Sequence, residues 1–512
     1  MKKILLIVSL ILWVNLSAQN EAANWYFGQN AGIQFDNTGN LIGSIDGGQL
    51  STLEGCTSIS DTNGNLLFYT DGNLVYNRNH QLMPNGTGLF GDSSSTQSAL
   101  VVPKPGDPNI YYIFTVDVAA TDNTDFGFNY SIVDITLDGG LGDISSKNIN
   151  LLQESSEKIT AVLKDCASQS IWVIVLSNVN DTLPLPGEQS NFDTYYAYEV
   201  ATTGLNTIPV KSTFLTQIRD ARGQMKVSPD GKKLASANTG AGLFLYDFDA
   251  ATGIVSNQQN LSISSFSSAS YGVEFSQNSL RLYVHSFNNQ NPNGPANIHR
   301  STLTQFNLEA ADIQASEFAV DERQLFRGSL QLGPDGKIYR ALSANYTTGL
   351  PFLGVIENPN AVGAAVVYTH NAVDLSPNLS TQGLPPFIQS FFNDQIDIIQ
   401  NGVSSTELSL CIGETYTLGY QDFPGAVYTW MKDGVLLPES DFDLVVTDPG
   451  LYTLHIEFNN GACETFDGEA LVSYFEVPVA NQPSDMDICD DDNDGLWSFD
   501  FTTKDIEVLG AQ

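Results

Sequence analysis

The chain has 512 residues, of which 42% are hydrophobic, and 58 Asp and Glu against 21 Lys and Arg give it a formal net charge of −37. A length of this order allows about three domains. The negative charge repels a phosphate backbone or an anionic lipid surface, which argues against nucleic acid or a membrane surface as a partner. A cationic or calcium-rich partner fits the charge, and acidity alone also keeps an exported protein in solution.

The N-terminus has the three parts of a secretory signal peptide. Lys2 and Lys3 precede an apolar run at residues 4–16, and Ser17 and Ala18 are small residues suited to cleavage. The apolar run is too short to span a bilayer comfortably, and no later stretch is long and apolar enough for a transmembrane segment. We therefore expect residues 1–18 to be removed near Ala18 and the mature protein to be secreted, extracellular or at the cell surface.

From residue 22 onward, one pattern recurs: a short alternating strand, a turn rich in Asp, Pro, Asn and Gly, and a second apolar strand. The clearest copy spans Met225–Gly253 and turns at Ser-Pro-Asp-Gly, residues 228–231. In such a turn proline fixes φ and glycine accepts a positive φ. The turns of the other copies lie at residues 36–39, 61–64, 105–109, 165–169, 276–279 and 333–336.

The last three copies align so that the same two apolar positions face inward, namely Met225 and Val227, Val273 and Phe275, and Leu330 and Leu332. Copies about 50 residues apart, each worth several short antiparallel strands, predict an all-β fold with a β-propeller over residues 22–398. Seven blades are preferred. Six are possible, because the turns at Asp36 and Asp61 lie close enough to share one blade. We expect residues 385–392 to form a late strand that pairs with the first blade and closes the ring.

The composition changes near residue 401. Residues 401–480 contain an early Cys411, a central Trp430, a corner ending at Tyr452 and a late Cys463. This order resembles an immunoglobulin-like or PKD-like β-sandwich of bacterial surface proteins. The resemblance implies a Cys411–Cys463 disulfide in an oxidising compartment, although Cys463 lies farther beyond the corner tyrosine than in immunoglobulin domains. The pairing of the other cysteines stays open, and these are Cys56, Cys166 and Cys489.

An acidic segment at residues 481–512 follows. Asp490, Asp492 and Asp494 precede Gly495 with the spacing of the first half of a calcium-binding loop. The second half does not match, because Phe501 stands where a bidentate carboxylate belongs. Calcium in another geometry, or a solvated acidic linker without metal, are the two interpretations, and no other cofactor is expected.

Catalytic patterns are weak in this sequence. The glycines of residues 86–91 match a dinucleotide-binding pattern by letter, but no helix follows them, so we expect a loop. A GxSxG nucleophile elbow is absent. The histidines fall in separate units, at His80, His285, His299, His370 and His455. We assign no catalytic residue and expect a protein that is not an enzyme. Three or more buried His, Asp or Glu at the channel mouth would favour an enzyme instead.

Two stretches resemble known families. Residues 227–253, with the SPDGK turn and a final D-x-x-TG, are similar to a blade of YVTN-type or lactonase-like bacterial propellers. The CDDDNDG run that starts at Cys489 resembles repeats of large secreted surface and gliding-motility-associated proteins of the Bacteroidetes, which the type nine secretion system exports with a type B sorting domain. The domain order matches the N-terminal part of such proteins. The resemblance implies that the chain is a fragment cut inside a repeat at Gln512.

Two functions follow as hypotheses, and a purely structural stalk segment is a third possibility. The first is a secreted modular surface protein, related to adhesion or gliding, whose propeller binds a protein or glycan ligand without catalysis. Export machinery would be a further partner if a C-terminal sorting domain follows. The alternative is a lactonase-like or polysaccharide-acting hydrolase or lyase with its site at the central channel. Binding residues are expected in the loops between copies, where the sequence repeats least.

Overall fold

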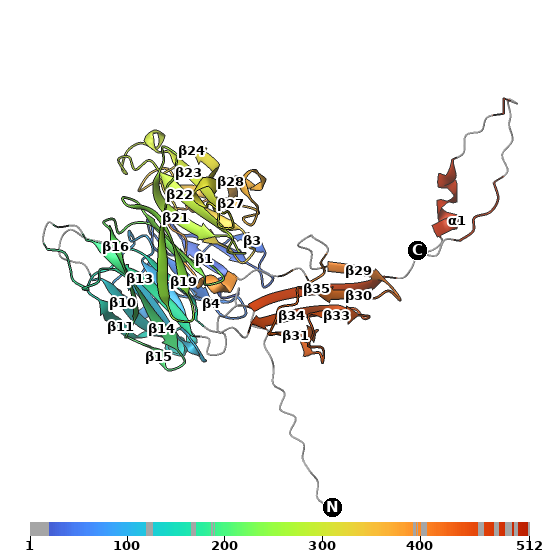
Figure 1. Cartoon of the computed structure of the whole chain (residues 1–512), viewed down its shortest axis with the longest axis horizontal. Coiled ribbons are helices and arrows are strands. Elements are labelled where there is room, and N and C mark those ends of the chain that lie inside the picture. The colour runs from blue at the N-terminus through green and yellow to red at the C-terminus, as the bar shows by residue number, and fades with distance from the viewer. Residues whose placement is uncertain are drawn as a thin grey trace, which may run out of the picture. The chain divides into compact units, whose positions relative to one another are not determined.

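The computed structural model describes residues 20–118, 126–164, 170–185, 188, 190–392, 396, 398–400, 407–458, 465–475, 481–486, 494–495 and 500–509. Almost all regular structure in them is β (Figure 1). The chain divides into two compact units, residues 1–394 with 458–464, and residues 395–457 with 465–512. No helix in the described part is long and apolar enough to cross a membrane. The predicted signal peptide lies outside the described residues.

Seven antiparallel sheets follow one another along the described part of residues 24–374, each built from consecutive strands. The first three sheets hold β1 (Asn24–Phe27), β2 (Ala31–Phe35) and β3 (Leu41–Ser44); β4 (Thr57–Ser60), β5 (Leu66–Thr70), β6 (Leu74–Asn77) and β7 (Leu82–Thr87); and β8 (Ala99–Lys104), β9 (Asp107–Val116), β10 (Phe128–Asp134) and β11 (Asp143–Leu152).

The other four sheets continue the series. They hold β12 (Ile159–Leu163), β13 (Ile171–Ser177), β14 (Phe192–Ala201), β15 (Gly204–Leu205) and β16 (Val210–Ile218); β17 (Met225–Val227), β18 (Lys233–Asn238), β19 (Gly242–Asp249) and β20 (Ile254–Leu261); β21 (Ala269–Phe275), β22 (Arg281–Phe287), β23 (Ser301–Asn307) and β24 (Phe318–Arg323); and β25 (Leu330–Leu332), β26 (Ile338–Ser343), β27 (Gly349–Ile356) and β28 (Tyr368–Asp374). Short 3₁₀ helices are η1 (Asn20–Ala22), η2 (Asp138–Gly140), η3 (Ala296–Ile298), η4 (Gln314–Ser316), η5 (Gly363–Ala365) and η6 (Gln389–Phe392).

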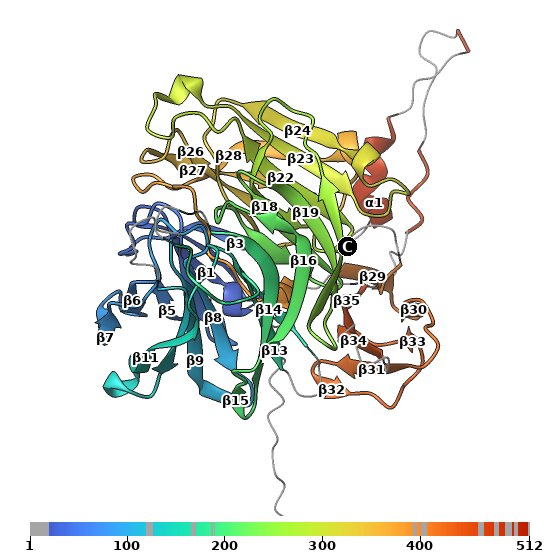
Figure 2. The same ribbon diagram turned by 60° about the vertical axis from the view of Figure 1, so that its left-hand side comes forward.

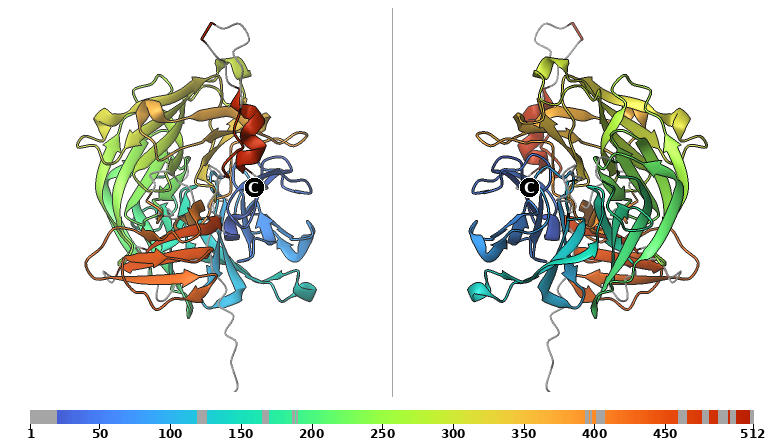
Figure 3. Two further views of the ribbon diagram at one scale, coloured as in Figure 1. Left: turned by 90° about the vertical axis from the view of Figure 1, so that its right-hand side faces the viewer. Right: turned by 90° about the vertical axis from the view of Figure 1, so that its left-hand side faces the viewer.

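The first strand of each sheet lies beside the first strand of the next sheet. The neighbours run from β1 and β4 through β8, β12, β17 and β21 to β25. Figures 2 and 3 show the sheets following one another in chain order, from β5 and β6 past β9 and β13 to β22 and β27. Sheets that radiate from a ring of inner strands form a β-propeller, as the repeats predict.

The ring closes where residues 379–382 lie between the seventh sheet and the first. The amide of Gln29 donates to the carbonyl of Leu379 at 2.9 Å, and the amide of Ser329 donates to the carbonyl of Gln382 at 2.7 Å. The prediction of a closing strand at residues 385–392 is wrong, because this segment makes one isolated bridge, from Ile388 to Ala161 in the fourth sheet, and then forms η6. Pro385 and Pro386 have no amide hydrogen to donate to a strand ladder, which accounts for the difference.

The turns at Asp36 and Asp61 belong to different sheets, so the suggestion that they share one blade is wrong. The first turn joins β2 to β3 and the second joins β4 to β5. The two turns lie close in sequence because β1, β2 and β3 are only four or five residues long. Each aspartate caps its own turn, and Asp61 Oδ1 accepts from the amides of Asn63 and Asn65 at 2.9 Å.

Apolar side chains pack between adjacent sheets. Met225 and Val227 lie in the core between the fourth and fifth sheets, and Val273 and Phe275 lie in the core between the fifth and sixth. All six predicted inward positions are fully buried. The residue between each apolar pair is polar and also buried, and these residues are Lys226, Glu274 and Gln331. Because successive side chains of a strand point to opposite faces, they face the central channel.

The second unit contains two sheets. Their strands are β29 (Glu407–Cys411), β35 (Thr465–Phe475), β34 (Gly450–Phe458), β31 (Ala426–Lys432) and β32 (Val435–Leu436) in one sheet, and β30 (Tyr416–Gly419) with β33 (Asp443–Val446) in the other. Trp430 is buried, and the Tyr452 hydroxyl donates to the carbonyl of Asp448 at 2.9 Å, which forms a tyrosine corner. Cys411 ends β29. Cys463 lies outside the described residues, so the disulfide stays a prediction.

Candidate binding site at the channel mouth

The two ends of the propeller channel differ. At one end, the connections between β17 and β18 and between β25 and β26 are tight turns. The other end, the mouth, carries the connections from each sheet to the next and two long loops, at residues 178–191 and 288–300. Loops of varied length on a rigid scaffold are where proteins place binding residues. The mouth is therefore the first place to look for a site.

A hollow of about 470 Å³ lies at the mouth. Five of its lining residues come from five different connections between sheets, namely Glu54, Ser94, Glu157, Arg222 and Arg327. Aromatic side chains, among them Phe287, Phe326 and Tyr346, line it as well. Residues that are far apart in the sequence thus meet at one end of the channel.

Glu54 and Arg327 form a buried ion pair in the wall of this hollow. Arg327 Nη2 lies 2.6 Å from Glu54 Oε1, and the side chains are only 4% and 1% exposed. The Arg327 guanidinium also donates from Nε to Gln382 at 2.7 Å and lies 4.6 Å from the ring centre of Tyr271. The Tyr271 hydroxyl donates to the same glutamate. Buried charges of this kind are retained only when paired and hydrogen-bonded.

Glu157 is a second buried carboxyl group at the mouth. Its Oε2 accepts from the amide and from the hydroxyl of Thr96, at 3.1 and 2.8 Å. The same hydroxyl lies 3.4 Å from Glu54, so the two carboxyl groups share one neighbour. Burial, and then the charge of Glu54, raise the pKa of Glu157 to about 7. Glu157 is therefore a carboxyl group that gains or loses its proton near neutral pH.

The raised pKa of Glu157 makes the propeller less stable at high pH. A carboxyl group whose pKa is higher in the folded protein contributes stability below its unfolded value, and this contribution is lost as the pH rises through the folded value, near 7. We expect Glu157→Gln to have a free energy of unfolding about 3 kcal/mol higher than the wild type at pH 8, measured by urea unfolding. At pH 4.5 we expect no such gain. The exposed Glu322→Gln is the control, and an equal gain at both pH values would contradict the assignment.

Two cations flank Glu157. The buried Lys158 ammonium donates to the backbone carbonyl of Arg222 at 3.0 Å and to that of Ala221, and burial lowers its pKa to about 8. Arg222 forms a two-point pair with Asp220, from Nε at 2.9 Å and from Nη2 at 2.7 Å. Pairing with Asp220 raises the pKa of Arg222, so the guanidinium stays charged.

One polar atom on each of two buried residues of the hollow has no protein partner. Among the described residues, neither Nη1 of Arg327 nor Oε1 of Glu157 makes a hydrogen bond, although both side chains are nearly fully buried and line the hollow. Neither atom is one of the fully buried polar atoms without a partner, so both are open to the hollow and can bond to a ligand group there. These two buried residues thus offer one donor and one carboxyl oxygen to whatever enters the mouth.

Below the mouth, polar side chains fill the channel. Lys226 Nζ lies 2.9 Å from Glu274 Oε2, and neither side chain is exposed. Glu274 also accepts from the amides of Phe275 and Leu332, both at 3.0 Å. Gln224 accepts from the amides of Val273 and Leu330, and so links the sixth and seventh sheets. A ligand therefore meets a closed floor rather than an open channel.

The residues singled out from the sequence do not meet at this site. Asp490 and Asp492 lie outside the described residues, and Asp494 precedes Gly495, whose φ of 77° suits a tight turn. In the described part, no group of three or more His, Cys, Asp or Glu is arranged to hold a metal ion. The histidines lie in different sheets or loops, and His285 is buried with its Nε2 3.1 Å from Arg340. The glycine pattern at residues 86–91 ends β7 and continues as a loop.

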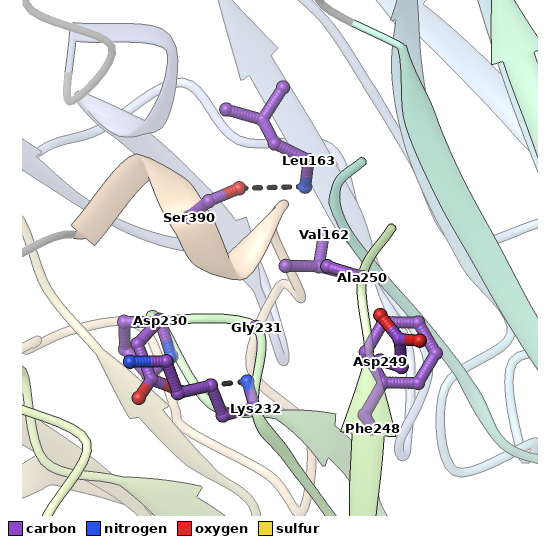
Figure 4. A pocket seen from close by; sticks show the side chains of 10 residues that line it. Val162, Leu163, Asp230, Gly231, Lys232, Phe248, Asp249, Ala250 and Ser390 are labelled. Carbon is purple, nitrogen blue, oxygen red and sulfur yellow. Dashed lines mark hydrogen bonds between the residues drawn. The ribbon is translucent and has the colours of Figure 1, made fainter. Parts of the chain in front are cut away.

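A second hollow, of about 260 Å³, lies at the opposite end, between the fourth and fifth sheets (Figure 4). Its polar groups are occupied by local structure. Ser390 Oγ accepts from the amide of Leu163 at 2.9 Å, Asp230 accepts from the amide of Lys232, and Asp249 accepts from the amide of Ala251. These aspartates act as turn caps, as the sequence predicts.

Two of the mouth residues stand in a short sequence motif that recurs in the repeats. Arg222-Gly223 and Arg327-Gly328 stand at the same place, just before the inward apolar positions of two copies. A Cβ on Gly223 would lie 2.4 Å from the carbonyl oxygen of Ala237, and one on Gly328 would lie 2.3 Å from that of Ala341. Only glycine fits at these two positions. Each arginine therefore belongs to a segment that leads into an inner strand and that recurs in two copies.

No protein family and no curated protein match the chain. The chain is similar in fold to 351 solved chains, among them two proteins. One is a candidate 6-phosphogluconolactonase from Bacteroides uniformis, with 11% identity and a TM-score of 0.35, covering 69% of this chain and 98% of that one. The other is the Dos1 propeller, with 10% identity and a TM-score of 0.32, covering 61% of this chain and 70% of that one. At these values no argument about function rests on either.

Proposed function

We propose that this is a secreted surface protein whose propeller binds a ligand at the channel mouth without transforming it. The observation that carries the proposal is the unpartnered pair, Arg327 Nη1 and Glu157 Oε1, in a hollow between aromatic side chains. A hydroxyl group donates and accepts at once, so a sugar satisfies both atoms, and sugar faces pack on rings such as Tyr346. A glycan therefore fits the hollow better than an apolar ligand.

Exposed apolar side chains on the mouth loops support a ligand that extends beyond the hollow. Leu185 is 67% exposed in the loop at residues 178–191, and Phe266 is 82% exposed in the connection before β21. Single exposed apolar residues are ordinary, but these stand on the same end of the propeller as the hollow. A polymer bound at the mouth has these side chains to rest on.

The rest of the chain suits display of the propeller at a surface, which we include in the proposal. The predicted signal peptide directs export, and the second unit with the acidic segment acts as a spacer. The resemblance of the acidic segment to repeats of type nine secretion substrates supports surface placement related to adhesion or gliding. Calcium at Asp490, Asp492 and Asp494 would stiffen that spacer, and calorimetric titration of the full chain with calcium tests it.

The binding proposal is tested with a glycan array followed by calorimetry. Val118 lines the hollow from its rim, and we expect Val118→Trp to fill the entrance and to weaken binding of any array hit by at least about tenfold, since each 1.4 kcal/mol is a factor of ten. Ile254→Trp, at an exposed position on the opposite end, is the matched control and should bind like the wild type. Equal affinities for both variants would overturn the proposal.

A second candidate function has one specific observation in its favour. Glu54, Glu157 and Asp220 line one hollow, but only Glu54 and Glu157 are buried and Asp220 is partly exposed, so the cluster meets the condition for a hydrolase or lyase only in part. A carboxyl group with a pKa near 7 suits general acid catalysis. Against it, Glu54 and Asp220 are held in ion pairs. Product formation from a bound polysaccharide, lost in Glu157→Gln, would establish the enzyme; binding without product supports the first proposal.

A further inference from the structure

We infer that the mouth takes a carboxylate group of its ligand, held between Nη1 of Arg327 and Nη1 of Arg222. This inference rests on the proposed binding function and names the chemical class of the ligand. A carboxylate of this kind is present in an acidic sugar and at the C-terminus of a peptide, and the experiment below separates the two sources.

The first support is the geometry of Arg327. Two of its guanidinium nitrogens are occupied, Nη2 by Glu54 and Nε by Gln382, and the third faces the hollow without a partner in the described structure. The guanidinium lies among the rings of Tyr271, Phe326 and Tyr346, at 4.6, 5.4 and 5.8 Å, so little water reaches it. A charge-assisted hydrogen bond from a buried guanidinium to a carboxylate is among the strongest that proteins make.

The second support is Arg222, which repeats this arrangement at the rim. Asp220 occupies Nε and Nη2, and within the described residues Nη1 has no hydrogen-bond partner. The Arg222 side chain is 40% exposed and lines the same hollow. Two arginines that are oriented by acidic neighbours thus each leave one NH₂ group for the ligand, and both groups are donors only.

The third support is the local balance of charge. Lys158, Arg222 and Arg327 are the cations that interact electrostatically with Glu157, and Glu54 and Asp220 are the anions beside them. Arg219 and Glu188 also line the hollow, and their opposite charges leave the balance unchanged. The Lys158 ammonium is held by two carbonyl oxygens, and no carboxylate of the described residues lies within 4 Å of it. When Glu157 is protonated, three positive charges face two negative ones. A ligand carboxylate supplies the missing negative charge, and a neutral sugar does not.

The same balance links binding to a proton. A carboxylate beside Glu157 disfavours the charged form of that residue, as Glu54 already does, and a protonated Glu157 Oε1 donates to the ligand. Binding of a carboxylate then requires the proton, so affinity is highest below the folded pKa of about 7 and falls as the pH rises above it. A neutral ligand shows no such dependence.

The test is calorimetry of the full chain at pH 6 and pH 8 with trigalacturonate, its neutral methyl ester, and a tetrapeptide with a free or an amidated C-terminus. We expect trigalacturonate or the free-acid peptide to bind at pH 6 and about tenfold more weakly at pH 8, and its neutral counterpart to bind at least tenfold more weakly at pH 6. Which of the two acids binds identifies the source of the carboxylate.

Variants make the result specific. Glu157→Gln keeps a neutral side chain at both pH values, so its affinity for the acid should fall less between pH 6 and pH 8 than that of the wild type, and the fall that remains belongs to Lys158, whose pKa is about 8. Arg222→Gln should bind the acid at least tenfold more weakly. Arg78→Gln, at an exposed arginine far from the hollow, should match the wild type. Equal binding of acid and ester overturns the inference. If only neutral array glycans bind, and Val118→Trp blocks them, this inference fails while the binding function stands.

Discussion

Replacing Lys226 by methionine is expected to lower the free energy of unfolding of the propeller by about 3–5 kcal/mol. Lys226 and Glu274 form an ion pair of 2.9 Å in the centre of the channel, and neither side chain is exposed. Removal of the lysine leaves a buried carboxyl group without its partner. Glu274 keeps its hydrogen bonds to Phe275 and Leu332, which do not neutralise its charge.

The double variant Lys226→Met with Glu274→Gln separates lost charge balance from lost packing. It removes both charges, and the glutamine oxygen still accepts from a backbone amide, so we expect it to be more stable than Lys226→Met alone. Urea unfolding followed by tryptophan fluorescence measures both variants. A double variant that is less stable than the single one would show that the pair is not the reason for the loss.

Replacing Trp25 by alanine is expected to lower the free energy of unfolding of the propeller by about 3–5 kcal/mol as well. Trp25 is fully buried, and its ring lies 5.3 Å from that of Tyr339 in the seventh sheet and 5.7 Å from that of Phe387 in the closing segment. Its indole nitrogen donates to the carbonyl of Ala22 at 2.8 Å. The substitution therefore opens a cavity where the first and last parts of the ring meet.

The control for Trp25 is Phe266→Ala, which removes a large aromatic side chain from an exposed position and should change stability by no more than about 0.5 kcal/mol. Thermal unfolding measures the loss of stability, and limited proteolysis shows which segments of the chain become accessible. For Trp25→Ala we expect early cleavage in the first sheet and after residue 388. A loss of stability with unchanged protection of these segments would contradict the role of Trp25 in closure.

The repeats made the fold predictable because each copy obeys local rules. Asp61 and Asp230 cap their turns, Gly231 has the positive φ of 71° that the turn requires, and the aligned apolar residues are buried. Closure of the ring was predicted a few residues too late in the chain and in the wrong form, because residues 379–382 make the closing hydrogen bonds and Pro385 and Pro386 cannot join a strand ladder. Local propensity favoured a strand that the prolines prevent.

The site was less accessible to sequence reasoning because no stretch of the chain contains it. Glu54 and Arg327 are 273 residues apart in sequence, and they meet only because the ring brings the second and seventh sheets together. Two signals were present in the repeats: the polar residue between each pair of inward apolar positions, and the Arg-Gly pair before the inner strand. Which of these polar residues lacks a hydrogen-bond partner depends on how the side chains pack. The spacing of residues along the sequence does not predict this packing.

The central claim, that the mouth binds the ligand, is tested most directly by hydrogen–deuterium exchange of the full chain with and without a ligand selected on the array. We predict slower exchange in the connections that carry Glu157, Arg222 and Arg327 and in the loop at residues 288–300, with no change in the turns at the opposite end. Slower exchange confined to those opposite turns or to the second unit would contradict the account.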